Sequence, residues 1–313
     1  MDKTEAIYDV VIIGGGPAGM AAALWCADLG LESILFEGSR EIGGQLLKIH
    51  NRIDNYIGLK TSNGREMRDV FAGQIAAART VTRSSALVTG IDVNGMSVLL
   101  ADGSVVPGRS LIIATGVRRR KLGIPGEDEF VGRGVLDSGA ASRDRVHGKR
   151  VVVVGGGDAA FENALILAEN AVSVTLLHRT VKFSAREEFI SNAMQNAKIE
   201  IVGNVQLTRI NGDAAVDEVE YLSLVTGKTT TIPADAVVIR IGVEPNSEVL
   251  PPEIELDDRG YVVTDKMCMT SVPLVFAIGD IANPLAPTIN GAAGDAATAV
   301  KAAYRLLAAS NAL

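Results

Sequence analysis

The pattern of hydrophobic and polar positions occurs twice along the chain. Residues 9–19, DVVIIGGGPAG, form a β-branched run that ends in glycines, and residues 150–160, RVVVVGGGDAA, repeat it. An alanine-rich helical stretch and a second strand-like run follow each copy, at 20–29 and 33–36 in the first and at 161–170 and 173–177 in the second. Strand, helix and strand in this order predict a βαβ unit with parallel strands. We therefore expect one nucleotide-binding module used twice.

Each copy ends with a further apolar run, at 110–116 and 235–242, and hairpin signals such as Asp102-Gly103 come before it. After Asn246 the pattern of hydrophobic positions again resembles that of the first copy, and it ends in a helical stretch at about 292–309. The predicted fold class is α/β, with two Rossmann-like three-layer nucleotide-binding domains, the second inserted into the first. The predicted boundaries are 1–116 with 246–313 for the first domain and 117–245 for the second.

Composition limits the classes of function. The chain has 313 residues, is 47% hydrophobic and carries a formal net charge of −7, which argues against disorder and against nucleic-acid binding driven by charge. No run reaches the roughly 18 apolar residues of a membrane span, and residues 1–5 lack the layout of a signal peptide. We expect a cytoplasmic protein with no membrane or nucleic-acid partner. The two cysteines, Cys26 and Cys268, form no CxxC, and the three histidines show no ligand spacing, so no metal site is predicted.

The first glycine cluster fits the dinucleotide fingerprint GxGxxG. Gly14 permits a tight turn, Gly16 lets the backbone approach a pyrophosphate, and Gly19 lets the helix pack on the strand. Glu37 ends the second strand, where a carboxylate accepts hydrogen bonds from a ribose diol. The cofactor-binding residues predicted in this module are Gly14, Gly16, Pro17, Ala18, Gly19, Glu37 and Gly38.

The second cluster has alanine in the third position, which still permits close helix packing. His178 and Arg179 end its second strand, so no carboxylate repels a 2′-phosphate and Arg179 is available to pair with one. This favours NADPH over NADH, although the pair also fits a solvated strand end. The nicotinamide-nucleotide residues predicted here are Gly155, Gly157, Asp158, Ala160, His178, Arg179 and Arg186.

Two nucleotide modules in one chain are typical of enzymes that pass a hydride to a flavin. Further motifs are Gly43-Gly44-Gln45-Leu46, Asn55, Thr115-Gly116, Gly242 with Pro245-Asn246, and Gly279-Asp280. In motif order and content, over essentially its whole length, the sequence resembles the low-molecular-weight thioredoxin reductase family. The resemblance implies a homodimer that binds FAD and NADPH. It adds Gly44, Gln45, Leu46, Asn55, Thr115, Gly116, Gly279 and Asp280 to the FAD site, and Gly242 to the NADPH site.

One departure from the family changes the expected chemistry. The redox CxxC of the family falls on residues 138–141, which here read Ser-Gly-Ala-Ala. A serine hydroxyl forms no mixed disulfide, so the usual route to thioredoxin is closed. The resemblance then implies an NAD(P)H-dependent flavoprotein oxidoreductase that passes hydride from NADPH to the flavin and on to an external acceptor. That acceptor is ferredoxin, flavodoxin or a small molecule, as in the ferredoxin-NADP reductases of the thioredoxin reductase type.

Two alternatives remain open. The first is a disulfide reductase that borrows the dithiol of a partner protein, and the second is a non-enzymatic redox sensor that keeps only FAD. No catalytic residue is assigned, since the chemistry centres on the flavin; His50 and Asp137 are the weak candidates for proton transfer. Cys26 is expected in the core. The basic run at 118–121 fits either a solvated hinge or a docking patch for an acidic carrier.

Overall fold

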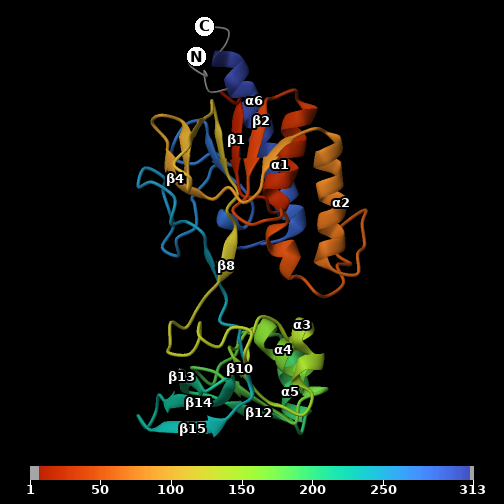
Figure 1. Ribbon diagram of the computed structural model, residues 1–313, viewed down its shortest axis with the longest axis vertical. Helices are drawn as coiled ribbons and strands as arrows, with labels where there is room; N and C mark the ends of the chain where they lie inside the picture. Colours follow the sequence, from red (N-terminus) through yellow and green to blue (C-terminus); the bar gives the residue numbers. More distant parts are fainter. Residues whose placement is uncertain (1–6, 311–313) are drawn as a thin grey trace. The chain divides into compact units, whose positions relative to one another are not determined.

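The computed structural model describes residues 7–310, and the chain divides into two compact units (Figure 1). Unit 1 consists of Met1–Arg118 and Glu244–Leu313, and unit 2 of Arg119–Val243. The sequence-based boundaries fall at 116/117 and 245/246, two residues from each of these divisions. The chain passes between the units through β8 (Val117–Arg119) and β17 (Val243–Pro245), which pair with each other.

The centre of unit 1 is a five-stranded sheet in the order β18-β7-β1-β2-β3. All of its pairings are parallel, and Val10 of β1 stands opposite Ser33 of β2. Every residue of β1, β2, β7 and β18 is buried, which explains the unbroken apolar runs in the sequence. The bounds are β1 Val10–Ile13, β2 Ser33–Phe36, β3 Val81–Arg83, β7 Leu111–Ile113 and β18 Val275–Ala277.

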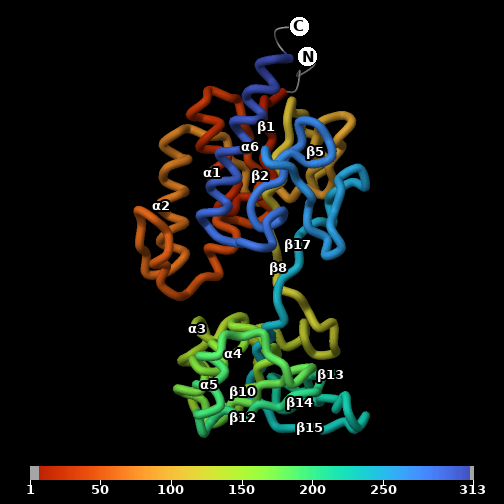
Figure 2. Tube along the Cα trace, turned by 180° about the vertical axis from the view of Figure 1, so that it is seen from behind, coloured from red at the N-terminus to blue at the C-terminus, as the bar shows by residue number. Residues whose placement is uncertain are grey.

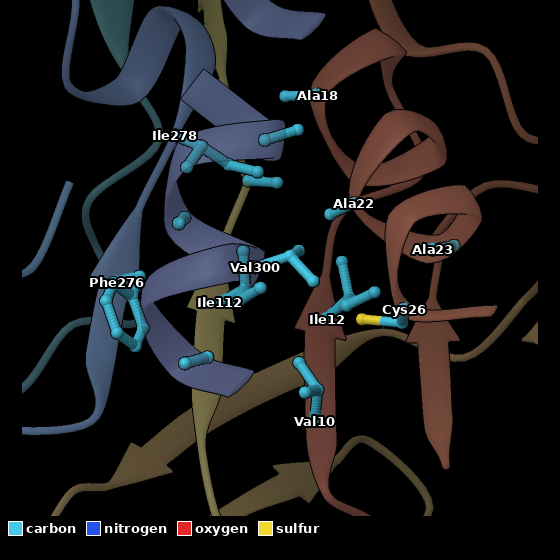
Figure 3. Close-up of a cluster of buried hydrophobic side chains, with 14 of the residues drawn as sticks. Val10, Ile12, Ala18, Ala22, Ala23, Cys26, Ile112, Phe276, Ile278 and Val300 are labelled. Carbon is cyan, nitrogen blue, oxygen red and sulfur yellow. The ribbon is translucent and has the colours of Figure 1, made fainter. Parts of the chain in front are cut away.

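Helices cover one face of this sheet and a small antiparallel sheet covers the other (Figures 1 and 2). Helices α1 and α6 pack through alanines against Ile12 and Ile112, and Cys26 lies in this core with no exposed surface, as expected (Figure 3). On the opposite face, Phe36 and Ile113 contact the small sheet through Val98. The bounds are α1 Pro17–Asp28, α2 Gly64–Ala77, α6 Ile289–Ser310, β4 Val88–Asp92, β5 Ser97–Leu100 and β6 Val105–Pro107, with 3-10 turns η1 at Gly44–Lys48 and η3 at Gly279–Ile281.

Unit 2 repeats the arrangement. Its main sheet has the order β12-β11-β10-β16-β9 with parallel pairings, and a three-stranded antiparallel sheet, β13-β14-β15, accompanies it. The bounds are β9 Val135–Leu136, β10 Arg150–Val154, β11 Ser173–Leu177, β12 Ile199–Val202, β13 Val205–Gly212, β14 Val216–Ser223, β15 Thr229–Pro233, β16 Ala236–Ile239, α3 Gly139–Ser142, η2 Asp144–Val146, α4 Asp158–Ala168 and α5 Glu187–Gln195. The predicted α/β fold class, with two modules of parallel sheets, is confirmed.

Arg118 and Lys121, at the two ends of the basic run at 118–121, form ion pairs with acidic residues of the chain. Arg118 forms ion pairs with Glu244 and Glu248, and the ammonium of Lys121 lies 2.6 Å from a carboxylate oxygen of Asp128. These pairs support the hinge interpretation for Arg118 and Lys121, whereas Arg119 and Arg120 donate to backbone carbonyl oxygens.

Candidate functional site

The first glycine turn shows why its glycines are needed. Gly14 has φ +109°, and a Cβ there would lie 2.3 Å from the carbonyl oxygen of Ala114, while a Cβ on Gly19 would lie 1.9 Å from that of Gly14. A Cβ on Gly16 would meet nothing closer than 3.9 Å. Gly14 and Gly19 therefore serve backbone packing, and Gly16 keeps the approach to the turn open. Gly16 caps α1 without a side-chain hydrogen bond, so the first N–H groups of the helix stay available to an anion.

A cavity of about 370 Å³ opens at this turn, at the carboxyl ends of β1, β7 and β18. The predicted residues in its wall are Gly14, Gly16, Pro17, Ala18, Glu37, Gly44, Gln45, Leu46, Thr115, Gly116 and Asp280. Residues that the sequence reasoning missed complete the wall, among them Lys48, Ile49, Pro287, Thr288 and Ile289. The last three precede or begin α6, and no motif marked them.

Glu37 stands at the end of β2, on the edge of the cavity. One of its carboxylate oxygens accepts a hydrogen bond from Gly15 N at 2.9 Å, and the other accepts one from Ser39 N at 2.8 Å. A carboxylate oxygen accepts two hydrogen bonds, so each oxygen keeps one free position. The two backbone bonds thus fix the carboxylate in place and leave it able to accept from a diol.

Two side-chain contacts hold the cavity wall together. Gln45 donates from Nε2 to the carbonyl oxygen of Val117 at 2.6 Å. Thr115 and Asn246 form a reciprocal pair, in which Thr115 Oγ1 donates to Asn246 O at 2.9 Å and Asn246 Nδ2 donates to Thr115 O at 2.7 Å. These contacts tie η1 and the two crossing segments to the first glycine turn.

Asp280 provides the test of whether the cavity suits a polyol. Its carboxylate lines the cavity and accepts no hydrogen bond from residues 7–310, whereas the neighbouring Asp295 accepts one from Gly279 N at 3.2 Å. Burial, and then the charge of Asp295, raise the pKa of Asp280. A desolvated carboxylate without a donor is suited to the hydroxyl groups of a ligand. The cavity therefore fits the phosphates, ribose and ribityl chain of FAD.

Gly19, which packs against Gly14, and four further predicted FAD or catalytic residues of unit 1 lie outside this wall. Gly38 lines a neighbouring cavity of about 350 Å³ together with Leu87. Gly279 is buried behind Asp280, and a Cβ on it would lie 2.8 Å from the Ala18 side chain. Asn55 is exposed, and its carbonyl oxygen accepts a hydrogen bond from Asn290 at 3.2 Å. His50 is also exposed, one residue beyond the wall.

The second glycine turn has the same geometry in unit 2. Gly155 has φ +147°, and a Cβ there would lie 2.1 Å from the carbonyl oxygen of Arg240 and 2.9 Å from the methyl group of Ala160. Gly157 caps α4 without a side-chain hydrogen bond, and a Cβ on it would meet only Ser184 Oγ at 3.4 Å. The turn thus presents free backbone N–H groups at the start of a helix, which suits a diphosphate.

The residues predicted to bind the 2′-phosphate differ in their exposure and in their contacts. His178 packs over the turn, within 2.4 Å of where a Cβ of Gly156 would be, and burial followed by the charge of Arg179 lowers its pKa. Arg179 is exposed and has no partner within residues 7–310. Arg186 is engaged: its Nε lies 2.9 Å from a carboxylate oxygen of Asp158, and its guanidinium covers the ring of Phe189. Arg179 is therefore the side chain left free for a phosphate.

The sequence marks Arg119 only as part of a basic run, and no pattern in it brings this residue together with Arg240 at the end of the unit 2 sheet. Arg119 and Arg240 both donate to the carbonyl oxygen of Asp137. The Asp137 carboxylate itself points outward, with its side chain 96% exposed. Gly242, predicted for the NADPH site, follows two residues after Arg240 with φ +95° and no atom within 4 Å of a Cβ position.

The two thiols are unsuited to electron transfer. Both cysteines are free, and burial raises the pKa of Cys26 to about 12 and that of Cys268 to about 11. The thiolate is the reactive form, so neither side chain is a nucleophile at neutral pH.

The fold and the two turns define a dinucleotide-binding oxidoreductase with one module for each of two nucleotides. Residues 8–303 match the family described as pyridine nucleotide-disulphide oxidoreductase, and the chain belongs to that family. It is 34% identical over 311 residues to the thioredoxin reductase of Mycolicibacterium smegmatis, which covers 98% of this chain and 99% of the relative. The thioredoxin reductase of Peptoclostridium acidaminophilum is 35% identical, covering 88% of this chain and 90% of the relative.

Solved structures agree with the family. The crystal structure of Lactococcus lactis thioredoxin reductase has a TM-score of 0.85 and 34% identity, and covers 96% of this chain and 99% of that one. The predictions of an NAD(P)H-dependent flavoprotein oxidoreductase and of FAD and NADPH as its cofactors are confirmed at the level of the family. The relatives favour the disulfide-reductase alternative over ferredoxin reduction. Within residues 7–310, no helix combines the length and apolar character needed to cross a membrane.

Proposed function

We propose that the protein oxidises NADPH through FAD and reduces a disulfide that another molecule carries. The observation that carries the proposal is the cavity of unit 1. An open glycine turn, the fixed carboxylate of Glu37 and the carboxylate of Asp280, which accepts no hydrogen bond from residues 7–310, share one wall of it. FAD, when bound, accepts a hydride from NADPH and gives an electron pair to the acceptor.

The roles in unit 1 follow from these contacts. The N–H groups at the start of α1 bind the diphosphate, and Gly16 leaves room for it. Glu37 accepts from the ribose diol with the lone pairs that Gly15 and Ser39 leave free. Asp280 accepts from a ribityl hydroxyl, which satisfies its desolvated carboxylate. Gly38 and Asn55 stay predictions for the periphery of this site.

In unit 2, the turn at Gly155 and Gly157 and the start of α4 bind the diphosphate of NADPH. Arg179 pairs with the 2′-phosphate, since Arg186 is held by Asp158. The neutral imidazole of His178 packs beside the adenosine half. The absence of an acid at the end of β11 supports NADPH over NADH.

The electron acceptor supplies the sulfur atoms that are reduced. The chain has two cysteines, one in the core and both with raised pKa values, so no internal dithiol stands between flavin and acceptor. Family membership supports a disulfide as the group that is reduced. The balance is one NADPH and one proton consumed per disulfide, with NADP⁺ and two thiols released. The proposal includes a homodimer, which rests on the family resemblance, and a cytoplasmic location.

The test follows NADPH oxidation by the purified, FAD-loaded protein without oxygen. Three acceptors are compared: oxidised thioredoxin, a small aromatic disulfide and oxidised ferredoxin. The proposal expects turnover with at least one disulfide and none with ferredoxin. Turnover with ferredoxin alone would contradict it in favour of direct carrier reduction, and a flavin that NADPH leaves oxidised would leave the redox-sensor alternative.

A further inference from the structure

Two arginines from distant segments meet at the carboxyl edge of the unit 2 sheet. Arg119 ends β8, and Arg240 directly follows β16. The Nη1 of Arg119 and the Nη2 of Arg240 donate to one atom, the carbonyl oxygen of Asp137, which follows β9. Two positive side chains therefore share a single uncharged acceptor. We call Arg119 and Arg240 the arginine pair.

The charges around the arginine pair do not neutralise it. The Asp137 carboxylate lies 3.7 Å from Arg119 Nη1, but its side chain is 96% exposed and water screens it. Glu162 on α4 acts on Arg240 only from a distance, and within residues 7–310 no carboxylate forms an ion pair with Arg240. The remaining contact of Arg240 is with the carbonyl oxygen of Ile239 at 3.2 Å. Each guanidinium has five N–H donors, so both keep donors unused.

The proximity of the two arginines is energetically unfavourable in the free protein. Burial, and then the charge of Arg119, lower the pKa of Arg240 to about 10, and burial also lowers the pKa of Arg119. Arg240 stays charged at neutral pH, because even its lowered pKa lies well above 7. Arg240 is half-buried and forms no ion pair within residues 7–310, which is unfavourable, and a bound anion that accepts several of its hydrogen bonds removes that penalty.

The position of the arginine pair indicates which ligand reaches it. The carbonyl oxygen of Arg240 adjoins Gly155, because β16 is the neighbour of β10 in the sheet. A dinucleotide crosses this edge at the glycine turn. Arg179 stands at the end of β11 on one side of the turn, while the arginine pair stands at the ends of β16 and β9 on the other side. The pair thus lies away from the 2′-phosphate, beside the half that carries the nicotinamide.

We infer that Arg119 and Arg240 form an anion subsite in unit 2 that holds a carboxylate or sulfonate group of the electron acceptor. The inference deepens the proposed function and rests on it, since it assigns the substrate class as a disulfide with an acidic substituent. Two planar guanidinium groups offer paired N–H donors that match the two oxygens of such a group. The subsite adjoins Ser138, the position at which the resembled family has its first cysteine.

The first experiment compares two aromatic disulfides that differ in charge. These are 5,5′-dithiobis(2-nitrobenzoate), which carries two carboxylates, and neutral 4,4′-dithiodipyridine. Arg119→Gln and Arg240→Gln are each expected to lower kcat/KM for the dianion about tenfold and to change that for the neutral disulfide less than about twofold. The control is Arg209→Gln, which removes the same charge from an exposed position of unit 2 and leaves both values unchanged. An equal fall for both disulfides, or no fall for either, would overturn the inference.

A second substitution predicts the opposite sign. Asp137→Asn keeps the carbonyl oxygen that holds the arginine pair and removes the one carboxylate close to it. It is expected to raise kcat/KM for the dianion about twofold, since the anion no longer meets a like charge. A fall in this value would contradict an anion subsite and indicate a purely structural arginine pair.

Two binding measurements separate this inference from the proposed function. Equilibrium dialysis of the dianion with the oxidised protein, in a Cys268→Ser background, needs no turnover and is expected to show about tenfold weaker binding in Arg240→Gln. The dissociation constant of NADP⁺ is expected to stay unchanged. Weaker NADP⁺ binding would overturn the assignment, because the anion would then be the diphosphate of the coenzyme. If the unmutated protein reduces neither disulfide, the proposed function is contradicted. The dialysis then still shows whether the arginine pair binds the dianion.

Discussion

Replacing Glu37 with alanine separates two roles that the structure gives to one carboxylate. In the free protein, Glu37 accepts from Gly15 N at 2.9 Å, in a half-buried place, and from Ser39 N at 2.8 Å, in an exposed one. A half-buried hydrogen bond to a charged acceptor contributes about 1.5–3 kcal/mol, and exposure reduces the second to about 0.5 kcal/mol. We expect the variant to lose roughly 2–3 kcal/mol of unfolding free energy without FAD.

The loss of FAD affinity adds to that effect. A ribose diol bound to the charged acceptor contributes about 1.5–3 kcal/mol, so Glu37→Ala is expected to raise the dissociation constant of FAD roughly ten- to hundredfold. Urea unfolding of the apoprotein measures the first quantity, and quenching of FAD fluorescence on titration measures the second. Glu32→Ala is the matched control, since Glu32 is exposed at the opposite end of β2.

The two measurements together test both roles of the Glu37 carboxylate. If Glu37→Ala destabilises the apoprotein but binds FAD within about twofold of the unmutated protein, the carboxylate only braces the glycine turn, and its assignment to the ribose is wrong.

Further predictions concern the other groups at the two sites. Burial raises the folded-state pKa of Asp280 above its unfolded value of 3.8, so its charge destabilises the apoprotein at neutral pH. Asp280→Asn should therefore raise the unfolding midpoint of the apoprotein at pH 7, and this gain in stability should vanish below about pH 4. The same substitution should lower the affinity for FAD. Arg179→Ala should narrow the ratio of flavin reduction rates with NADPH and NADH, and an unchanged ratio would contradict the 2′-phosphate contact. Cys268→Ser and thiol alkylation should leave NADPH oxidation by ferricyanide intact, since the pKa of Cys268 is raised to about 11; a loss in folded protein would implicate the thiol. The double variant Ser138→Cys with Ala141→Cys should take up two extra reducing equivalents in a dithionite titration. The two positions lie about one helical turn apart at α3, so the introduced cysteines are close enough to form a disulfide.

The sequence predicts the fold well because the relevant signals are local. A β-branched run such as 150–154, buried along almost its whole length, followed by glycines and a helix, is set by residues within one short segment. The same holds for the glycine turns, where Gly14 and Gly155 occupy backbone conformations that side chains rarely adopt. Twofold repetition of this pattern then determines the architecture of both units.

The parts of the sites that escaped prediction depend on distant pairings. Arg240 contacts the carbonyl oxygen of a residue 103 positions earlier. Arg186 reads as a free phosphate ligand in sequence, but it pairs with Asp158, 28 positions before it. Thr288 lines the cavity because α6 begins beside the first glycine turn, and no residue pattern near it marks a ligand. Such contacts are set by how the elements pack, which a single sequence does not display.

The most direct test of the central claim is an anaerobic titration of the FAD-loaded protein with NADPH, followed by the visible absorbance of the flavin. One equivalent of NADPH is expected to bleach the flavin, and one equivalent of a suitable disulfide is then expected to restore the colour with release of two thiols. A flavin that stays oxidised under excess NADPH, or one that is bleached but that no disulfide reoxidises, would contradict that claim.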